Sequence, residues 1–101
     1  MNETFNIRID REAIEKFCRE HHIRKMALFG SVLRSDFRDE SDVDILVEFD
    51  KDMEPGLIGL GSMESALSDI IGRPVEMRTP EDLSKLFRQE VISSAEVLYA
   101  D

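Results

Sequence analysis

Two aspartates at the start of an apolar run are the residues of this chain best placed to do chemistry. Asp42 and Asp44 open the stretch DVDILVEF. Side chains two residues apart on a strand point to the same side, about 6.6 Å apart, so both carboxylates are expected to project together. Neighbouring carboxylates repel, and a divalent cation relieves that repulsion. Oxygen ligands with positions left for water suit Mg²⁺ or Mn²⁺, which often also binds substrate phosphates.

A glycine–serine pair lies upstream, with ten residues between Ser31 and Asp42. Gly30 ends the apolar run RKMALF, and a short helix is expected to follow over residues 31–38. Glycine lets a ligand approach the backbone closely, and a helix N-terminus presents N–H groups to an anion. Ser31 adds a hydroxyl donor. Each motif alone is weak, because a solvated turn before a strand explains most Asp-x-Asp pairs. Together they indicate a nucleoside triphosphate site.

The elements that must position these residues alternate between helix and strand. The best strand is 42–49, where Val43, Ile45, Val47 and Phe49 share one face and the two aspartates the other. This order predicts the α/β (α+β) class, with a small mixed β-sheet and helices packed on one face. The expected elements are helix 10–21, strand 24–29, helix 31–38, strand 42–49, helix 55–71 ended by Gly72, strand 74–79, and a mostly helical segment from 79 that ends in the short extended stretch AEVLY.

Size and charge narrow the function classes. The chain has 101 residues and no linker-like stretch, which predicts a single domain over residues 1–101. The net charge of −9 argues against general nucleic-acid binding and against an anionic membrane surface. Cys18 is the lone cysteine, and the N-terminal stretch MNETFNIRID has no signal pattern, so a cytoplasmic protein is expected.

The conjunction of motifs resembles a known family signature. Gly30-Ser31, ten residues, then Asp42-Val43-Asp44 is similar to the signature of the DNA polymerase beta-like nucleotidyltransferase superfamily. The short chain and the stretches LFGS and SDVDILVEF resemble its minimal nucleotidyltransferase branch, the MNT or MntA-type antitoxins. The likeness continues through PGLIGL, GRPVEMRTPEDL and EVLYA. It implies a polymerase-beta-like fold and transfer of AMP from ATP to a hydroxyl, with two Mg²⁺ ions (or Mn²⁺).

The resemblance also assigns roles to residues. It implies that Asp42, Asp44 and Glu76 hold the metal ions and act in catalysis, Glu76 as acceptor of the hydroxyl proton. Glu76 lies in PVEMRT, at a position where the family usually has aspartate.

Three residues are phosphate candidates by the same resemblance: Gly30, Ser31 and Arg34. Arg34 matches a family arginine, and a surface arginine on a short helix is the alternative interpretation. Arg78 is a weaker candidate, since alternation places it on the same face as Glu76.

Three functions compete. The first is a protein adenylyltransferase that modifies a tyrosine of a HEPN-family toxin, which the resemblance implies as partner. The second is an antitoxin that neutralises its toxin by binding alone. Glu76 motivates this alternative, because one extra methylene moves a carboxylate by about 1.5 Å, and a misplacement of about 1 Å can cost about a hundredfold in rate. The third, modification of a small molecule, usually requires an added domain for the acceptor.

Overall fold

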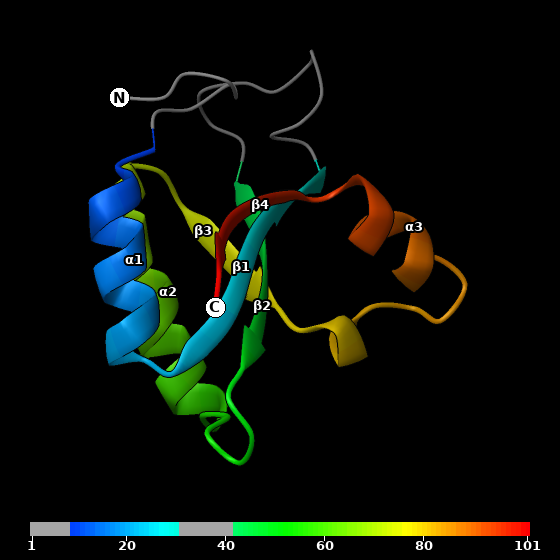
Figure 1. The fold of residues 1–101 in the computed structure, drawn as a ribbon, viewed down its shortest axis with the longest axis horizontal. Helices are drawn as coiled ribbons and strands as arrows, with labels where there is room; N and C mark the ends of the chain where they lie inside the picture. Colours follow the sequence, from blue (N-terminus) through cyan, green and yellow to red (C-terminus); the bar gives the residue numbers. More distant parts are fainter. Residues whose placement is uncertain (1–8, 31–41) are drawn as a thin grey trace.

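The computed structural model describes residues 9–30 and 42–101, and its helices and strands form one sheet with helices on either side (Figure 1). In chain order the elements are α1 (Arg11–Glu20), β1 (Ile23–Phe29), β2 (Val43–Phe49), α2 (Leu57–Ile71), β3 (Val75–Arg78), the 3-10 turn η2 (Pro80–Asp82), α3 (Arg88–Ser94) and β4 (Glu96–Ala100). The expected short helix over 31–38 lies outside the described residues.

The sheet is mixed, as expected. Its strand order is β3-β2-β1-β4, with β2 and β3 parallel and the other two pairs antiparallel. Figure 1 shows α1 and α2 together on one side of the sheet, and α3 on the other side, apart from the strands. The α/β class with a small mixed sheet is therefore confirmed. On the face opposite α1 and α2, Ala27 and Leu46 are buried, while the polar side chains of β2 and β3 stay partly exposed.

The core lies between the sheet and the helix pair α1 and α2. Alternation along β2 sends Val43, Ile45 and Val47 into it, and each is fully buried. The other members of this core cluster are Ile9, Ile14, Phe17, Cys18, Ile23, Met26, Leu28, Phe49, Met63, Leu67, Val75, Met77 and Leu98. The same alternation leaves Asp44, Glu48, Glu76 and Arg78 pointing away from the core.

Two predicted helix signals are confirmed at the ends of α1 and α2. Asp10 caps α1, since its Oδ1 accepts a hydrogen bond from the N–H of Ala13 at 3.2 Å. Gly72 ends α2 in the left-handed region at φ 80°, where glycine has no steric penalty. Helix α2 begins at Leu57, two residues later than expected from Pro55, because Gly56 is still extended. None of the described helices combines the length and the apolar character that crossing a membrane requires.

The C-terminal segment is less helical than expected. Thr79 and Asp82 do form a capping pair, with Asp82 Oδ2 accepting the Thr79 N–H at 3.1 Å. However, the turn η2 stops at once because Leu83 is extended, with ψ 144°. Helix α3 then has seven residues and no buried side chain, so no packing extends it. The expected extended ending AEVLY is confirmed as β4.

The reactivity of Cys18 tests whether the core is closed around this buried residue. Burial raises the pKa of its thiol from 9.0 to about 12, because the interior disfavours the thiolate. Native protein at pH 8 should therefore react with iodoacetamide about a thousandfold more slowly than urea-unfolded protein. Since the folded-state pKa is the higher one, this group's stabilising contribution is complete below pH 9 and is lost as the pH rises toward 12. Equal labelling of folded and unfolded protein would contradict the buried position.

Candidate active site

The central feature of the site is the pairing of Asp44 with Glu76. These two residues are register partners on the parallel strands β2 and β3. Paired residues of neighbouring strands, about 4.8 Å apart, point to the same side of the sheet. Asp44 and Glu76 therefore share the face opposite the core, and both are half-buried. Residues 32 positions apart in the chain are thus brought together by the sheet.

Gly30 completes the immediate surroundings of Asp44. Phe29, the last residue of β1, pairs with Asp44, and Gly30 follows it at φ 75°. A Cβ atom on Gly30 would lie 2.5 Å from Oδ2 and 3.3 Å from Cγ of Asp44. Any other residue would collide with the carboxylate and would also be strained at this φ. Glycine is needed here because the backbone packs directly against the Asp44 side chain.

Helix α2 holds the outer edge of β3 in place. Because β3 is an edge strand, the N–H groups of Val75 and Met77 have no neighbouring strand to bind. Ser68 Oγ accepts the Val75 N–H at 3.0 Å, and Glu64 Oε2 accepts the Met77 N–H at 2.7 Å. Glu76 lies between these two anchored residues, so its position relative to Asp44 is fixed from both sides of the strand.

Glu64 and Ser68 were missed at the level of the sequence. They lie four residues apart on α2, a spacing that places polar side chains on one face of a helix. The spacing would have indicated that these two residues bind the N–H groups of β3 only if β3 had been known to lie at the edge of the sheet. Nothing in the sequence says that β3 ends the sheet.

Arg78 is bound to Glu76. Its Nη2 lies 2.6 Å from Glu76 Oε1, and its Nη1 donates to the carbonyl oxygen of Met77 at 3.3 Å. Both side chains of the pair are more than two-fifths exposed. Exposed ion pairs contribute about 0.2–1 kcal/mol, so water and other ligands compete with this one. The pair draws the Glu76 carboxylate along β3 toward Arg78.

Of the remaining predicted residues, Asp42 is the one in the described part of the chain. Asp42 precedes β2 by one residue and is exposed. Ser31 and Arg34 lie outside the described residues. Within residues 9–30 and 42–101, no three Asp, Glu, His or Cys side chains are grouped so that they could hold a metal ion as they stand.

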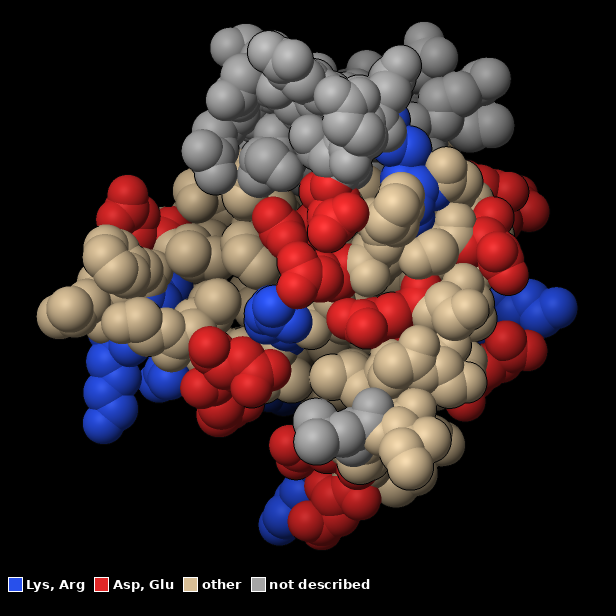
Figure 2. All heavy atoms as spheres, turned by 180° about the vertical axis from the view of Figure 1, so that it is seen from behind, with Lys and Arg blue, Asp and Glu red and all other residues tan. Residues whose placement is uncertain are grey.

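The donor chemistry nevertheless fits a hard divalent cation. Carboxylate oxygens are the ligands that Mg²⁺ and Mn²⁺ prefer, and Asp44 and Glu76 present them at paired positions. The missing Cβ at Gly30 leaves room for the Asp44 carboxylate against the backbone. Figure 2 shows acidic side chains gathered on the side of the molecule where β3 lies, next to a basic side chain. Excess negative charge at this place favours a cation over an anion as ligand.

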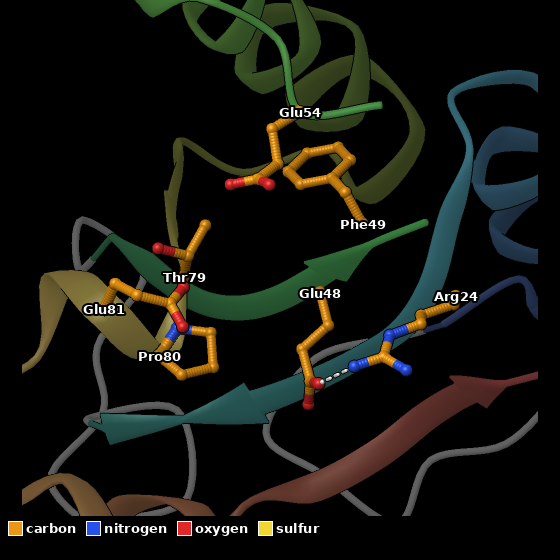
Figure 3. Close-up of a pocket in the computed structure, with 7 residues that line it drawn as sticks. All are labelled: Arg24, Glu48, Phe49, Glu54, Thr79, Pro80 and Glu81. Atoms are coloured by element: carbon orange, nitrogen blue, oxygen red, sulfur yellow. Dashed lines mark hydrogen bonds and ion pairs between the residues drawn. The ribbon is translucent and has the colours of Figure 1, made fainter. Parts of the chain in front are cut away.

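A pocket of about 200 Å³ opens elsewhere, around the far end of β2. Figure 3 shows Glu48 turned toward Arg24, with Glu54 and Glu81 on either side of Thr79. Glu48 follows Asp44 by four residues, about 13 Å along the strand. The pocket lining holds three carboxylates and one guanidinium, and that guanidinium is already paired with Glu48 at 2.9 Å. A triphosphate would be repelled, so we do not place the nucleotide in this pocket.

Comparison with known proteins gives a consistent result. Residues 12–101 match the protein family described as "Polymerase beta, Nucleotidyltransferase". The chain is 31% identical over 77 residues to the protein adenylyltransferase MntA of Thermococcus cleftensis, across 76% of this chain and 74% of that protein.

Two solved structures share the fold. A toxin–antitoxin crystal structure with AMP-PNP superimposes with a TM-score of 0.73 at 21% identity, covering 92% of this chain and 75% of the other. A structure of a tri-AMPylated Shewanella oneidensis HEPN toxin in complex with its MNT antitoxin gives a TM-score of 0.65 at 22% identity, covering 90% and 70%.

The Gly30 contact can be tested directly. Gly30→Ala should lower the free energy of unfolding by about 1–3 kcal/mol, because it adds strain at positive φ and a collision with Asp44. Gly61→Ala is the matched control, since no atom lies within 4 Å of its added Cβ and alanine favours a helix. Urea unfolding measures both variants. A Gly30→Ala protein as stable as the Gly61→Ala protein would show that the close approach is absent.

Proposed function

Because the chain belongs to the polymerase beta nucleotidyltransferase family, we propose that it transfers AMP from ATP to a hydroxyl group of a partner protein, a tyrosine of a HEPN toxin, and so acts as the antitoxin. The observation that supports this most is the register pairing of Asp44 with Glu76 beside Gly30. We place the reaction in the cytoplasm.

The carboxylates have distinct proposed roles. Asp42, Asp44 and Glu76 would hold two Mg²⁺ ions, with Mn²⁺ able to substitute. When bound, these ions neutralise charge on the triphosphate and the departing pyrophosphate. Gly30, Ser31 and Arg34 would hold the phosphates, Gly30 by letting them approach the backbone closely.

The proposed transfer forms one bond at the α-phosphorus of ATP and breaks another. The attacking hydroxyl oxygen forms a bond to the α-phosphorus of ATP, and the bond from that phosphorus to the bridging oxygen of pyrophosphate breaks. Glu76 would accept the hydroxyl proton as general base, since its carboxylate lies on the same face as Asp44. The products are the AMP ester of the acceptor and pyrophosphate.

A protein acceptor is supported by two exposed apolar residues in the segment just before α3. Leu86 and Phe87 are 86% and 58% exposed and precede α3, which lies on the side of the sheet opposite α1 and α2 (Figure 1). Contiguous exposed apolar side chains, rather than single ones, are typical of protein-binding surfaces, and Leu86 and Phe87 are neighbours in the chain. The related HEPN toxin and MNT antitoxin structure is a complex of that kind, and we extend it to this chain as a proposal.

The second candidate is an antitoxin that acts by binding alone. The pair between Glu76 and Arg78 favours it, because the third carboxylate is engaged away from Asp44. In this case the acidic chain would cover a cationic surface of the toxin.

Transfer of label separates the two candidates. Protein, Mg²⁺ and α-labelled ATP are incubated with the purified toxin, and labelled toxin is followed by gel and mass spectrometry. Catalysis predicts labelled tyrosine in the wild type. The Asp42→Ala plus Asp44→Ala variant should still bind the toxin but neither label nor inhibit it. Full inhibition by that variant, without label, would support binding alone and overturn the enzymatic proposal.

Nucleotide binding gives a simpler prediction for Asp44. Asp44→Asn should abolish Mg²⁺-dependent ATP binding while the fold is retained, because the charge that attracts the cation is lost and repulsion with Glu76 is relieved. Differential scanning fluorimetry with and without ATP and Mg²⁺ measures this. Equal stabilisation of the wild type and the variant by ATP and Mg²⁺ would contradict the assigned role.

The apolar surface has its own test. Leu86→Glu should weaken the complex with the toxin by about tenfold or more, since central apolar contacts in interfaces are worth about 1–2 kcal/mol or more. Ile58→Glu is the matched control, because Ile58 is 93% exposed on α2, away from the site face. Biolayer interferometry compares the two. If both variants bind the toxin as tightly as the wild type, the partner does not use this surface.

A further inference from the structure

We propose that Arg78 is a positioning residue that holds the Glu76 carboxylate against β3 in the ligand-free protein and releases it when a divalent cation and nucleotide bind. Arg78 would then turn toward the phosphates. This inference rests on the proposed function of the same site. It concerns a residue outside the Gly-Ser and Asp-x-Asp signature.

The first step of the argument is the direction in which Glu76 points. Its backbone is fixed opposite Asp44 by strand pairing. Its Oε1, however, lies 2.6 Å from Arg78 Nη2, two residues further along the same strand and opposite Leu46 rather than Asp44. The backbone is therefore placed for the site while the carboxylate is engaged beside it. This agrees with the absence of a three-ligand metal group among the described residues.

The second step is the length of the side chain. Residues two apart on a strand are about 6.6 Å apart, and a glutamate has one more methylene than an aspartate with which to span part of that distance. The same extra length lets the carboxylate swing between Arg78 and the space beside Asp44. An aspartate at position 76 would reach toward Arg78 less well. Glu76 and Arg78 thus form a matched pair.

The third step is the strength of the contact. Both partners are more than two-fifths exposed, so the pair is screened by water and easily exchanged. A divalent cation between Asp44 and Glu76 attracts two carboxylates and outcompetes one exposed guanidinium. The freed guanidinium then lies beside the incoming phosphates, whose oxygens match its planar fork of donors.

Removal of the Arg78 guanidinium should change the affinity for the cation and the affinity for the nucleotide in opposite directions. A cation without nucleotide should bind more tightly, because it no longer competes with the guanidinium for Glu76 and is no longer repelled by it. A nucleotide added in saturating cation should bind more weakly, because a phosphate partner is lost. A residue with only a structural role would lower both affinities or neither.

The experiment uses Mn²⁺ as the probe, with binding followed by electron paramagnetic resonance. For Arg78→Gln we expect the Mn²⁺ dissociation constant to fall by about three- to tenfold relative to the wild type. The dissociation constant of AMP-PNP in saturating Mn²⁺ should rise by a similar factor. Arg78→Lys keeps the charge without the fork and should change both constants less. Glu76→Asp should tighten Mn²⁺ binding as Arg78→Gln does.

Arg24→Gln is the matched control. Arg24 pairs with Glu48 at 2.9 Å on the same sheet, so this variant removes the same charge from the same kind of pair. Glu48 lies about 13 Å along β2 from Asp44. The control should leave both constants within about twofold of the wild type, because exposed charges more than about 10 Å apart are screened.

The outcomes separate this inference from the proposed function. Unchanged or weaker Mn²⁺ binding in Arg78→Gln, with wild-type binding that depends on Asp44, would overturn the role of Arg78 and leave the site standing. If Arg24→Gln and Arg78→Gln change the two dissociation constants equally, the effect comes from net charge alone, and the positioning role of Arg78 is also overturned. Wild-type protein that binds no Mn²⁺ would overturn the proposed function itself and this inference with it.

Discussion

The parallel pairing of β2 with β3 is the constraint on which the rest of this molecule depends. The Val43 N–H binds the Pro74 carbonyl at 2.8 Å, and α2 binds the outer edge of β3 through Ser68 and Glu64. A slip of one residue would turn Met77 out of the core and Glu76 into it. The register that buries the apolar side chains is therefore the same one that sets Glu76 opposite Asp44. The free energy of the core fixes the geometry of the carboxylates.

This coupling accounts for how a short chain can present a polar site. Helices α1 and α2 cover a single face of the sheet, and the cluster that includes Phe17, Ile45 and Leu67 is packed there. The opposite face buries Ala27 and Leu46 but leaves Asp44 and Glu76 partly exposed, so it can carry carboxylates beside a glycine backbone. Helix α3, with no buried residue, adds little to the core and stands on this side of the sheet (Figure 1). The large apolar core and the paired carboxylates are thus on opposite faces of the sheet.

The alternation of apolar and polar residues, together with the signals that begin and end helices, made much of the fold predictable from sequence. The strand 42–49, the cap at Asp10, the stop at Gly72 and the shared face of Glu76 and Arg78 follow from local rules and agree with the structure. The C-terminal segment did not follow, because a capping signal starts a turn but only packing extends a helix. The edge contacts of Glu64 and Ser68 depend on strand order, which residue spacing does not encode. Positions 31 and 34 remain predictions.

The length of the Glu76 side chain does not by itself decide where its carboxylate lies. A longer carboxylate with no neighbour would sample many rotamers, and its presence beside Asp44 would be rare. Here Arg78 draws the carboxylate along β3, and the hydrogen bond that the Met77 N–H donates to Glu64 holds the backbone at the outer edge of the strand. If the site binds a cation as we propose, Glu76 has two held positions: beside the guanidinium, as in the structure, or at the cation beside Asp44. A cation could then move the Glu76 carboxylate at little cost. It would have to offset only the free energy of the ion pair with Arg78, which is small because that pair is exposed.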